Sequence, residues 1–96
     1  HRLYAVSVEL PPLRSRREEI GPLAEHFLSR EQCGAELDPG ALSCLTAYDW
    51  PGNVRELRNV IARAAALAQG FRIMVSDVSE AVRAYQRQRQ HHRVSN

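Results

Sequence analysis

The fold of this chain is decided by residues 50–57, which read Trp-Pro-Gly-Asn-Val-Arg-Glu-Leu. Proline followed by glycine predicts a sharp turn, because proline fixes its own φ angle and glycine adopts conformations that are costly for other residues. Asn53 is then the predicted N-cap of a helix, with Glu56 three residues later as in a capping box. The helical spacing of apolar residues continues to Gly70, the predicted left-handed C-cap. The stretch therefore predicts a tight turn followed by a long amphipathic helix.

The predicted helix after the turn is the strongest in the sequence, because its apolar residues recur without a break. Its apolar residues are Val54, Leu57, Val60, Ile61, Ala64, Ala65, Leu67 and Ala68. Trp50, immediately before the turn, is predicted to be a core anchor beneath it. Arg58 and Arg63 are predicted to lie on the solvent-exposed side of this helix.

Two more helices are predicted upstream. The first spans about 18–32, has Ile20, Leu23, Ala24, Phe27 and Leu28 on one face, and is closed by Gly34. The second spans about 39–48, with Asp38 as N-cap and Pro39 at the first helical position. This second helix is expected to bury Leu42, Leu45 and Tyr48.

A fourth helix is predicted downstream of Gly70. A short extended piece at 72–75 precedes Ser76, the predicted N-cap, and the helix runs from Asp77 to Tyr85. The polar residues 86–96 that follow cannot bury enough apolar surface to fold alone, so they are predicted to be a linker or the fraying end of this helix.

Residues 4–10 alternate apolar and polar side chains, which predicts a strand with one buried face. No other segment except the short piece at 72–75 shows a comparable pattern, and a single strand cannot satisfy its own backbone hydrogen bonds. The strand is therefore predicted to pair with a sheet formed by residues upstream of this chain.

Composition narrows the class of protein. The chain has 96 residues, of which 44% are hydrophobic and 25% charged, as in one small globular domain. No apolar run approaches the roughly 20 residues of a membrane span, and the N-terminal stretch does not resemble a signal peptide. The two cysteines, Cys33 and Cys44, show no CxxC spacing, so no metal site is predicted and both are expected to be small apolar fillers. A soluble, cytoplasmic protein with no membrane partner is expected.

Charge is distributed unevenly along the chain. All 13 basic residues are arginine, and the formal net charge is +2. Residues 81–96 carry four of these arginines and no acid, whereas residues 1–80 have a net charge of −2. Only the C-terminal tail is basic, and four charges would give weak, salt-sensitive binding to nucleic acid.

Residues 50–57 also carry a resemblance. Together with residues 10–14, Leu-Pro-Pro-Leu-Arg, they resemble the C-terminal part of the AAA+ domain of sigma-54-dependent bacterial transcription activators. Residues 18–20, 59–61 and Arg63-Ala64 fit the same family, and the resemblance covers about residues 2–80. It implies a mainly α fold in which a small four-helix lid bundle is preceded by one strand cut from an α/β ATPase core.

The resemblance also implies the domain organisation. Residues 1–17 would be the last strand of the AAA+ core and the proline segment that connects it to the lid. Residues 18–85 would form the helical lid subdomain, and 86–96 a basic linker or tail.

Arg55 is the leading candidate site residue. In the first turn of its predicted helix it lies near backbone N–H groups that favour anions, and its guanidinium fork suits phosphate oxygens. A positive charge there also costs about 0.3–1 kcal/mol, so the helix itself does not explain the residue. Without the family motif, an ion pair with Asp49 or Glu56 would be the simpler interpretation. The resemblance implies that Arg55 is a sensor that reaches the γ-phosphate of ATP.

The resemblance assigns further nucleotide contacts. Leu13 and Arg14 lie where the family's proline segment passes the adenine, and Val54 could close over the base. Arg2 resembles an arginine that acts across the subunit boundary on the neighbouring nucleotide. The cofactor implied is ATP with Mg²⁺, held by the intact parent protein.

The sequence contains no GxxxxGK phosphate loop, no acidic strand for magnesium and no GAFTGA loop. This stretch alone is therefore expected neither to bind ATP tightly nor to hydrolyse it. The implied partners are neighbouring subunits of a homo-oligomeric ring, sigma-54 RNA polymerase through the core, and DNA through a C-terminal helix-turn-helix.

Two alternatives remain open on the sequence. In one, the helices at 39–48 and 53–69 form a stand-alone helix-turn-helix-like DNA-binding module. The net negative charge of residues 1–80 argues against it, because a recognition surface should be basic. In the other, the chain is a purely structural oligomerisation domain in which Arg55 only caps or pairs.

Overall fold

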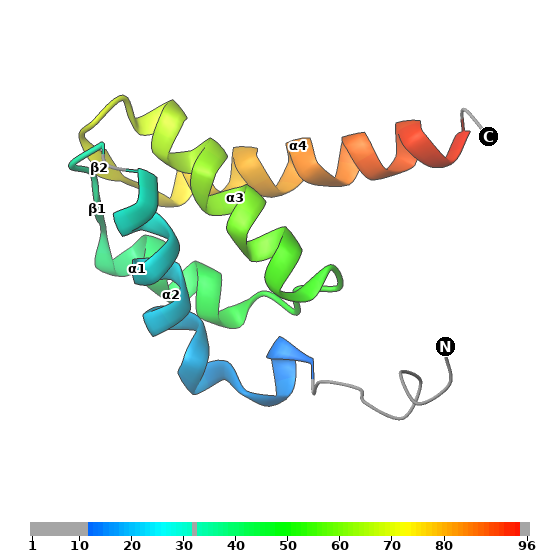
Figure 1. Ribbon diagram of the computed structural model, residues 1–96, viewed down its shortest axis with the longest axis horizontal. Helices are drawn as coiled ribbons and strands as arrows, with labels where there is room; N and C mark the ends of the chain where they lie inside the picture. The colour runs from blue at the N-terminus through cyan, green and yellow to red at the C-terminus, as the bar shows by residue number, and fades with distance from the viewer. Residues whose placement is uncertain (1–11, 32, 95–96) are drawn as a thin grey trace.

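The computed structural model describes residues 12–31 and 33–94, with side chains as far as residue 89. Four helices dominate the described chain: α1 (Ile20–Glu31), α2 (Pro39–Ala47), α3 (Asn53–Ala68) and α4 (Val75–Val94) (Figure 1). Two short 3-10 turns, η2 (Leu13–Ser15) and η3 (Arg17–Glu19), precede α1. The mainly α bundle is confirmed, whereas the strand predicted at 4–10 lies outside the described residues.

Helix α3 lies at the centre of the bundle, packed against α1 and α4. Its buried face includes the apolar residues Leu57, Val60, Ile61, Ala64, Ala65 and Ala68. Val54 and Leu67 belong to the apolar residues of the same helix, but they are 41% and 43% exposed. The apolar stripe in the sequence is therefore wider than the face that α1 and α4 cover.

The helix boundaries agree with the sequence in part. Asp38 caps α2, its Oδ2 accepting a hydrogen bond from the Gly40 N–H at 2.9 Å. Ser76 is not the N-cap of α4, because that helix already begins at Val75 and the Asp77 side chain accepts the Met74 N–H at 2.9 Å. The Asp77 carboxylate therefore reaches back to the N–H of the residue before the helix, as the acidic residue of a capping box does.

Two very short strands pair the connection between α1 and α2 with the connection between α3 and α4. Strand β1 (Glu36–Leu37) pairs in parallel with β2 (Arg72–Ile73), and the Asp38 N–H donates to the carbonyl of Ile73 at 3.0 Å. Residues 72–73 belong to the predicted extended piece, but β1 was not predicted, because two residues are too few to display an alternating pattern. Between α3 and β2, the C-cap of α3 is Gln69 at φ 55°, and Gly70 follows it at φ 83° rather than forming the cap.

Helix α4 continues past its predicted end at Tyr85 to Val94, so residues 86–94 are helical. In Figure 1 its C-terminal part extends beyond the other three helices. Within the described part of the chain, no helix combines the length and the apolar character needed to cross a membrane.

Candidate functional site

The turn between α2 and α3 is built on Trp50. Its carbonyl accepts the Asn53 N–H at 2.8 Å, and its indole Nε1–H donates to the Leu45 carbonyl at 2.7 Å. The side chain is fully buried and lies edge-on to Tyr48, with ring centroids 4.8 Å apart. Trp50 has φ 53°, in the left-handed region that costs an L-residue about 1–2 kcal/mol. Burial and the indole hydrogen bond offset that cost, which confirms Trp50 as a core anchor.

Asn53 does not cap α3, contrary to the prediction. Gly52 is the N-cap residue and Asn53 is the first helical residue, at φ 55°, a conformation that asparagine tolerates better than most residues. Its side-chain Oδ1 instead accepts the Leu13 N–H at 3.2 Å. Asn53 therefore joins the segment before α1 to the start of α3.

Glu56 is fully buried, and both of its carboxylate oxygens have hydrogen-bond donors. Oε1 accepts the Gly52 N–H at 2.8 Å, and Oε2 accepts the Tyr48 hydroxyl at 3.0 Å. Glu56 thus serves the N-cap residue as in a capping box, but from the fourth helical position, because α3 begins one residue earlier than predicted. The sequence did not indicate Tyr48 as a partner, since it lies on the far side of the turn.

Tyr48 connects this carboxylate to α4. Its hydroxyl oxygen accepts a hydrogen bond from Gln86 Nε2 at 3.0 Å. Burial raises the pKa of the Tyr48 hydroxyl above its ordinary value; the bond from Gln86 opposes this rise, and Glu56 adds to it. Tyr48 therefore stays protonated at neutral pH and can donate to Glu56.

Arg17 holds the other side of the turn. Its guanidinium donates to the carbonyls of Thr46 and Tyr48 at 2.6 and 3.0 Å, and to Asp49 Oδ1 at 2.7 Å. A cation at the C-terminal end of α2 is also favoured by the helix dipole. These contacts fix the segment before α1 against the turn. They could not be predicted from the sequence, because the partners lie far apart along the chain.

Arg55 is exposed in the first turn of α3, and it makes no ion pair within the described residues. The two acids that were alternative partners are engaged elsewhere, Asp49 with Arg17 and Glu56 with Tyr48 and Gly52. The simple ion-pair interpretation of Arg55 is therefore wrong for the described chain.

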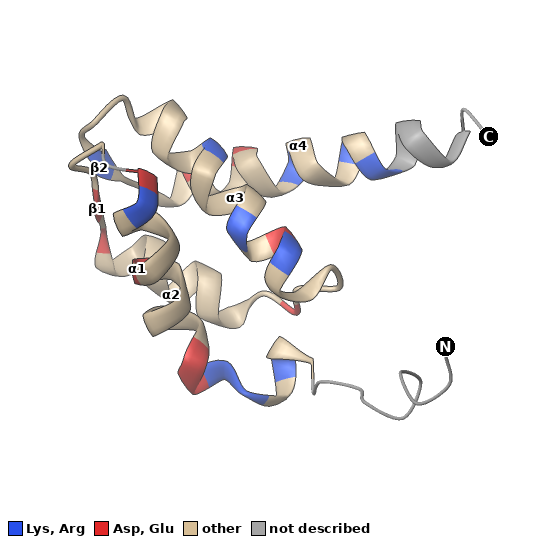
Figure 2. Cartoon of the chain, in the orientation of Figure 1, with Lys and Arg blue, Asp and Glu red and all other residues tan. Residues whose placement is uncertain are grey.

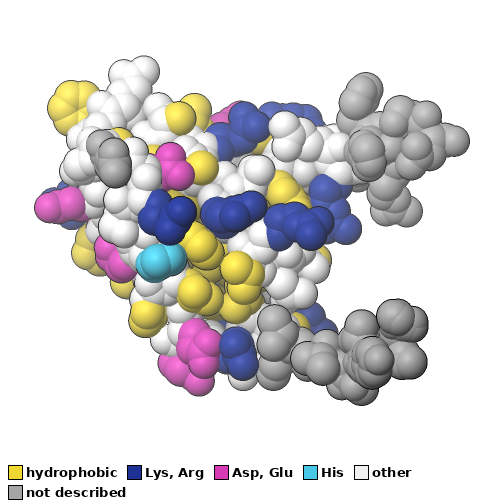
Figure 3. Space-filling model, viewed as in Figure 1, with side chains coloured by type: hydrophobic (Ala, Val, Ile, Leu, Met, Phe, Trp, Pro, Cys, Tyr) yellow, Lys and Arg dark blue, Asp and Glu magenta, His cyan; other side chains and the backbone are white. Residues whose placement is uncertain are grey.

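Arg58 and Arg63, farther along α3, are exposed as predicted. Figure 2 shows basic positions along this helix, and Figure 3 shows basic side chains gathered on the viewed face of the molecule. Together with Arg55 they leave three arginines on α3 open to solvent.

The structure brings some of the other predicted nucleotide contacts near the start of α3. Leu13 is 1% exposed and belongs to the core, while its N–H is bound by Asn53. Arg14 and Val54 are exposed. Arg2 lies outside the described residues.

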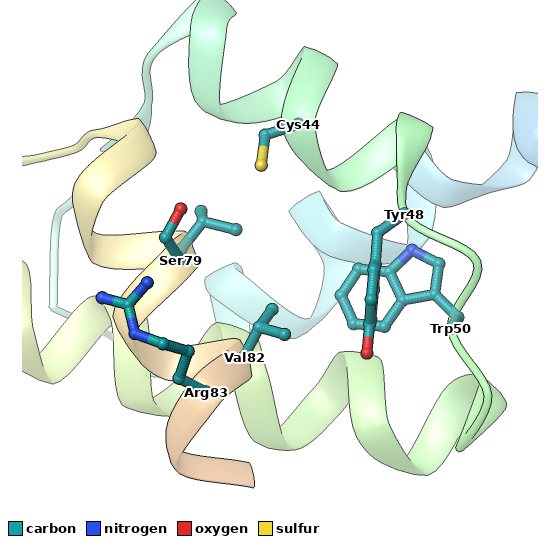
Figure 4. Close-up of a pocket in the computed structure, with 7 residues that line it drawn as sticks. Cys44, Tyr48, Trp50, Ser79, Val82 and Arg83 are labelled. Carbon is teal, nitrogen blue, oxygen red and sulfur yellow. The ribbon is translucent and has the colours of Figure 1, made fainter. Parts of the chain in front are cut away.

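A separate pocket of about 250 Å³ opens between α2 and α4 (Figure 4). Its lining residues are Cys44, Tyr48, Trp50, Val78, Ser79, Val82 and Arg83. None of the predicted nucleotide contacts lines it. Cys44 and Cys33 are half-buried against the core, as expected of apolar fillers. Among the described residues, no three His, Cys, Asp or Glu side chains gather as a metal site would require.

The fold is a small, mainly α domain in which a Pro-Gly turn precedes the central helix α3. The family model of the AAA+ ATPase lid domain matches residues 14–95, and the chain belongs to this family. The match includes residues 86–95, so the helical continuation of α4 falls within the family's domain.

The chain is similar to bacterial regulatory proteins. It is 44% identical to the regulatory protein AtoC of Escherichia coli (strain K12) over 88 residues, which are 86% of this chain and 19% of AtoC. It is 43% identical to the transcriptional regulatory protein ZraR of Salmonella typhi over 89 residues, 88% of this chain and 20% of ZraR. The DNA-binding transcriptional regulator NtrC of Escherichia coli (strain K12) is 42% identical over 83 residues, 81% of this chain and 18% of NtrC.

The chain thus spans about a fifth of the length of these curated relatives. Their names are those of transcription regulators, the class of protein that residues 50–57 indicated. The recognition of the chain as the lid part of an AAA+ domain is confirmed.

Proposed function

We propose that this chain is the lid of an ATP-dependent transcription activator of the sigma-54 class, and that Arg55 senses the γ-phosphate of ATP. The observation that carries the proposal is the state of Arg55, which is exposed at the start of α3 and free of ion pairs within the described residues. A helix N-terminus disfavours a positive charge unless an anion is near, so a phosphate group would relieve this cost.

The neighbours of Arg55 are consistent with a nucleotide against this end of the lid. Val54 and Arg14 are exposed, and Asn53 connects α3 to the backbone of Leu13. In the proposal the backbone at Leu13 and the side chains of Arg14 and Val54 lie along the base, and Arg2 reaches the nucleotide of the neighbouring subunit. ATP with Mg²⁺, bound by the core of the parent protein, would supply the free energy for remodelling the RNA polymerase holoenzyme.

The partners follow from the class of protein. The proposed parent is a cytoplasmic AAA+ ATPase that forms a homo-oligomeric ring, engages sigma-54 RNA polymerase through its core and binds DNA through a helix-turn-helix. Loss of the γ-phosphate on hydrolysis would release Arg55 and let the lid move relative to the core. Without the core, the chain itself would be inactive.

The test is ATP hydrolysis by the full-length parent carrying Arg55→Ala, with Arg58→Ala as the matched control. Both arginines are exposed on α3 and make no ion pair within the described residues. We expect Arg55→Ala to lower turnover roughly 10²-fold or more, the loss seen when a donor to transition-state charge is removed. Arg58→Ala should retain near-normal turnover, and sedimentation should show normal assembly for both variants.

Unchanged turnover in Arg55→Ala, or an equal loss in both variants, would overturn the assignment of Arg55. A parent without ATPase activity would overturn the proposal as a whole. Binding of duplex DNA by residues 1–82 would then be measured at increasing salt, since the helix-turn-helix alternative requires affinity that does not depend on the basic tail.

A further inference from the structure

We propose that Glu56 is a positioning residue of the sensor site, which holds the turn at residues 50–53 and thereby fixes the direction in which Arg55 leaves α3. The inference rests on the proposed function of Arg55. It assigns a second residue to the same site, one that acts through Arg55 and does not contact the nucleotide.

The burial of Glu56 needs an explanation. Its side chain is fully buried, and no basic side chain in the described residues forms an ion pair with it. Removing a carboxylate from water costs several kcal/mol unless hydrogen bonds compensate. The donors are the Gly52 N–H at 2.8 Å and the Tyr48 hydroxyl at 3.0 Å, one on each oxygen. An apolar residue would fill the same space at lower cost, so the carboxylate is specific to this hydrogen-bond geometry.

The Glu56 side chain contacts the backbone of the turn that precedes Arg55. A side chain at Gly52 would place its Cβ 2.8 Å from the Glu56 Cβ, so the glutamate packs directly against the turn. Consecutive residues of an α-helix point about 100° apart. Because Glu56 is held inward by the turn, Arg55 is directed to the exposed side of α3.

A second contact extends the arrangement to α4. Gln86 donates to the Tyr48 hydroxyl at 3.0 Å, and Tyr48 donates to Glu56. The chain of hydrogen bonds therefore runs from α4, through the residue that follows α2, to the N-cap of α3. The network thus leads from the exposed Gln86 through the half-buried Tyr48 to the fully buried Glu56, whose carboxylate needs its donors most.

The experiment measures ATP turnover of the full-length parent carrying Glu56→Ala, Arg55→Ala or both. We expect Glu56→Ala to lower kcat roughly 10-fold, because small misplacements of a catalytic group cost about this much or more. The double variant should turn over no more slowly than Arg55→Ala alone, since Glu56 acts through Arg55. If Glu56 only stabilised the fold, the loss of turnover in the double variant would be the product of the losses in the two single variants.

Two milder variants keep the test informative if Glu56→Ala does not fold. Glu56→Gln retains an oxygen for the Gly52 N–H and should recover most of the turnover lost in Glu56→Ala. Tyr48→Phe keeps the ring against Trp50, removes one donor and should lower kcat by a smaller factor. Val60→Ala, which removes buried apolar atoms from the same helix, is the control for lost stability and should leave kcat unchanged at a temperature where it is folded.

The outcomes separate the two proposals. If Arg55→Ala lowers turnover while Glu56→Ala and Tyr48→Phe do not, only the assignment of Glu56 is overturned. Multiplied losses in the double variant would likewise overturn the assignment of Glu56 alone. If Arg55→Ala leaves turnover unchanged, the proposed function of Arg55 fails and the positioning role fails with it.

Discussion

Among single residues, conformational cost is concentrated in the turn before α3. Trp50 and Asn53 both adopt left-handed backbone angles, at φ 53° and 55°. Each such residue costs about 1–2 kcal/mol, and such outliers persist only where the surroundings determine them. Here the determinants are the buried indole and the bond from the Leu13 N–H to Asn53. The turn is therefore sensitive to small changes in shape.

Gly52→Ala tests this sensitivity. The new Cβ would lie 2.8 Å from the Glu56 Cβ, so the helix start must shift, and we expect a loss of about 1–3 kcal/mol in the free energy of unfolding. Gly21→Ala is the matched control, because its Cβ would meet only Leu42 Cδ1 at 3.6 Å and alanine favours a helix by about 0.5–1 kcal/mol. Urea unfolding followed by circular dichroism should give opposite signs, and equal effects would contradict the strain expected at Gly52.

Tyr48 predicts a dependence of stability on alkaline pH. Its pKa is raised on folding, chiefly by burial. The folded state therefore holds the proton more tightly than the unfolded state. Stability should be constant below the unfolded pKa of about 10 and fall as pH rises from there through the folded pKa.

Denaturant unfolding of the wild type and Tyr48→Phe between neutral pH and about pH 11 measures this effect. The difference between their unfolding free energies should change only above about pH 10. If the two unfolding free energies change in parallel over the whole pH range, Tyr48 does not cause the loss of stability at alkaline pH.

Among the elements, α2 is the shortest of the four helices, and contacts at both of its ends hold it. Asp38 satisfies the Gly40 N–H at the start, and Arg17 binds the carbonyls of Thr46 and Tyr48 at the end. Helices of this length are marginal by themselves, so such terminal contacts and tertiary packing decide whether they form. Because Arg17 also binds the residue after Tyr48, the same side chain sets the entry into the turn.

Arg17→Ala should lower the free energy of unfolding by about 1–2 kcal/mol, because it removes charge-assisted bonds to two helix-terminal carbonyls. Arg16→Ala removes only the exposed pair with Glu19 and should cost less than about 1 kcal/mol. Arg17→Lys keeps the charge without the fork and should recover part of the loss. Equal stability of the Arg17→Ala and Arg16→Ala variants, measured by urea unfolding, would contradict the role of Arg17.

In the whole molecule, packing depends on how closely α1 and α4 approach α3. Small residues on the buried face of α3, among them Ala64 with no exposed surface, permit this approach. Interiors packed at crystal density leave no room for added atoms. The tightness of this centre determines where the start of α3, and with it Arg55, lies relative to the other helices.

Ala64→Leu should therefore destabilise the fold by about 1–3 kcal/mol through overpacking. Ala66→Leu places the same side chain on the exposed side of α3 and should change stability by less than about 0.5 kcal/mol. Thermal unfolding of the two variants at equal concentration checks this. A tolerated leucine at position 64 would mean that the centre of the bundle is not tightly packed.

The sequence predicted the fold class, the four helices and the place of Arg55 in the first turn of α3. These features are local: apolar spacing, the Pro-Gly turn and the Asp38 cap each depend on residues close together in the chain. The role of Arg55 came from the family resemblance and remains a prediction. Residue spacing alone could not exclude an ion pair to Asp49.

Tertiary structure decided the partners of the polar residues around the turn. The sequence predicted Asn53 as the N-cap of α3, yet its side chain accepts the N–H of Leu13, 40 residues away along the chain. The capping-box spacing predicted a local hydrogen bond from Glu56 to the start of the helix, but it did not predict the bond from the Tyr48 hydroxyl. Hydrogen-bond partners distant in sequence meet only when the helices pack, and burial then selects which groups must be satisfied. The local pattern therefore determined the elements, and packing determined the site.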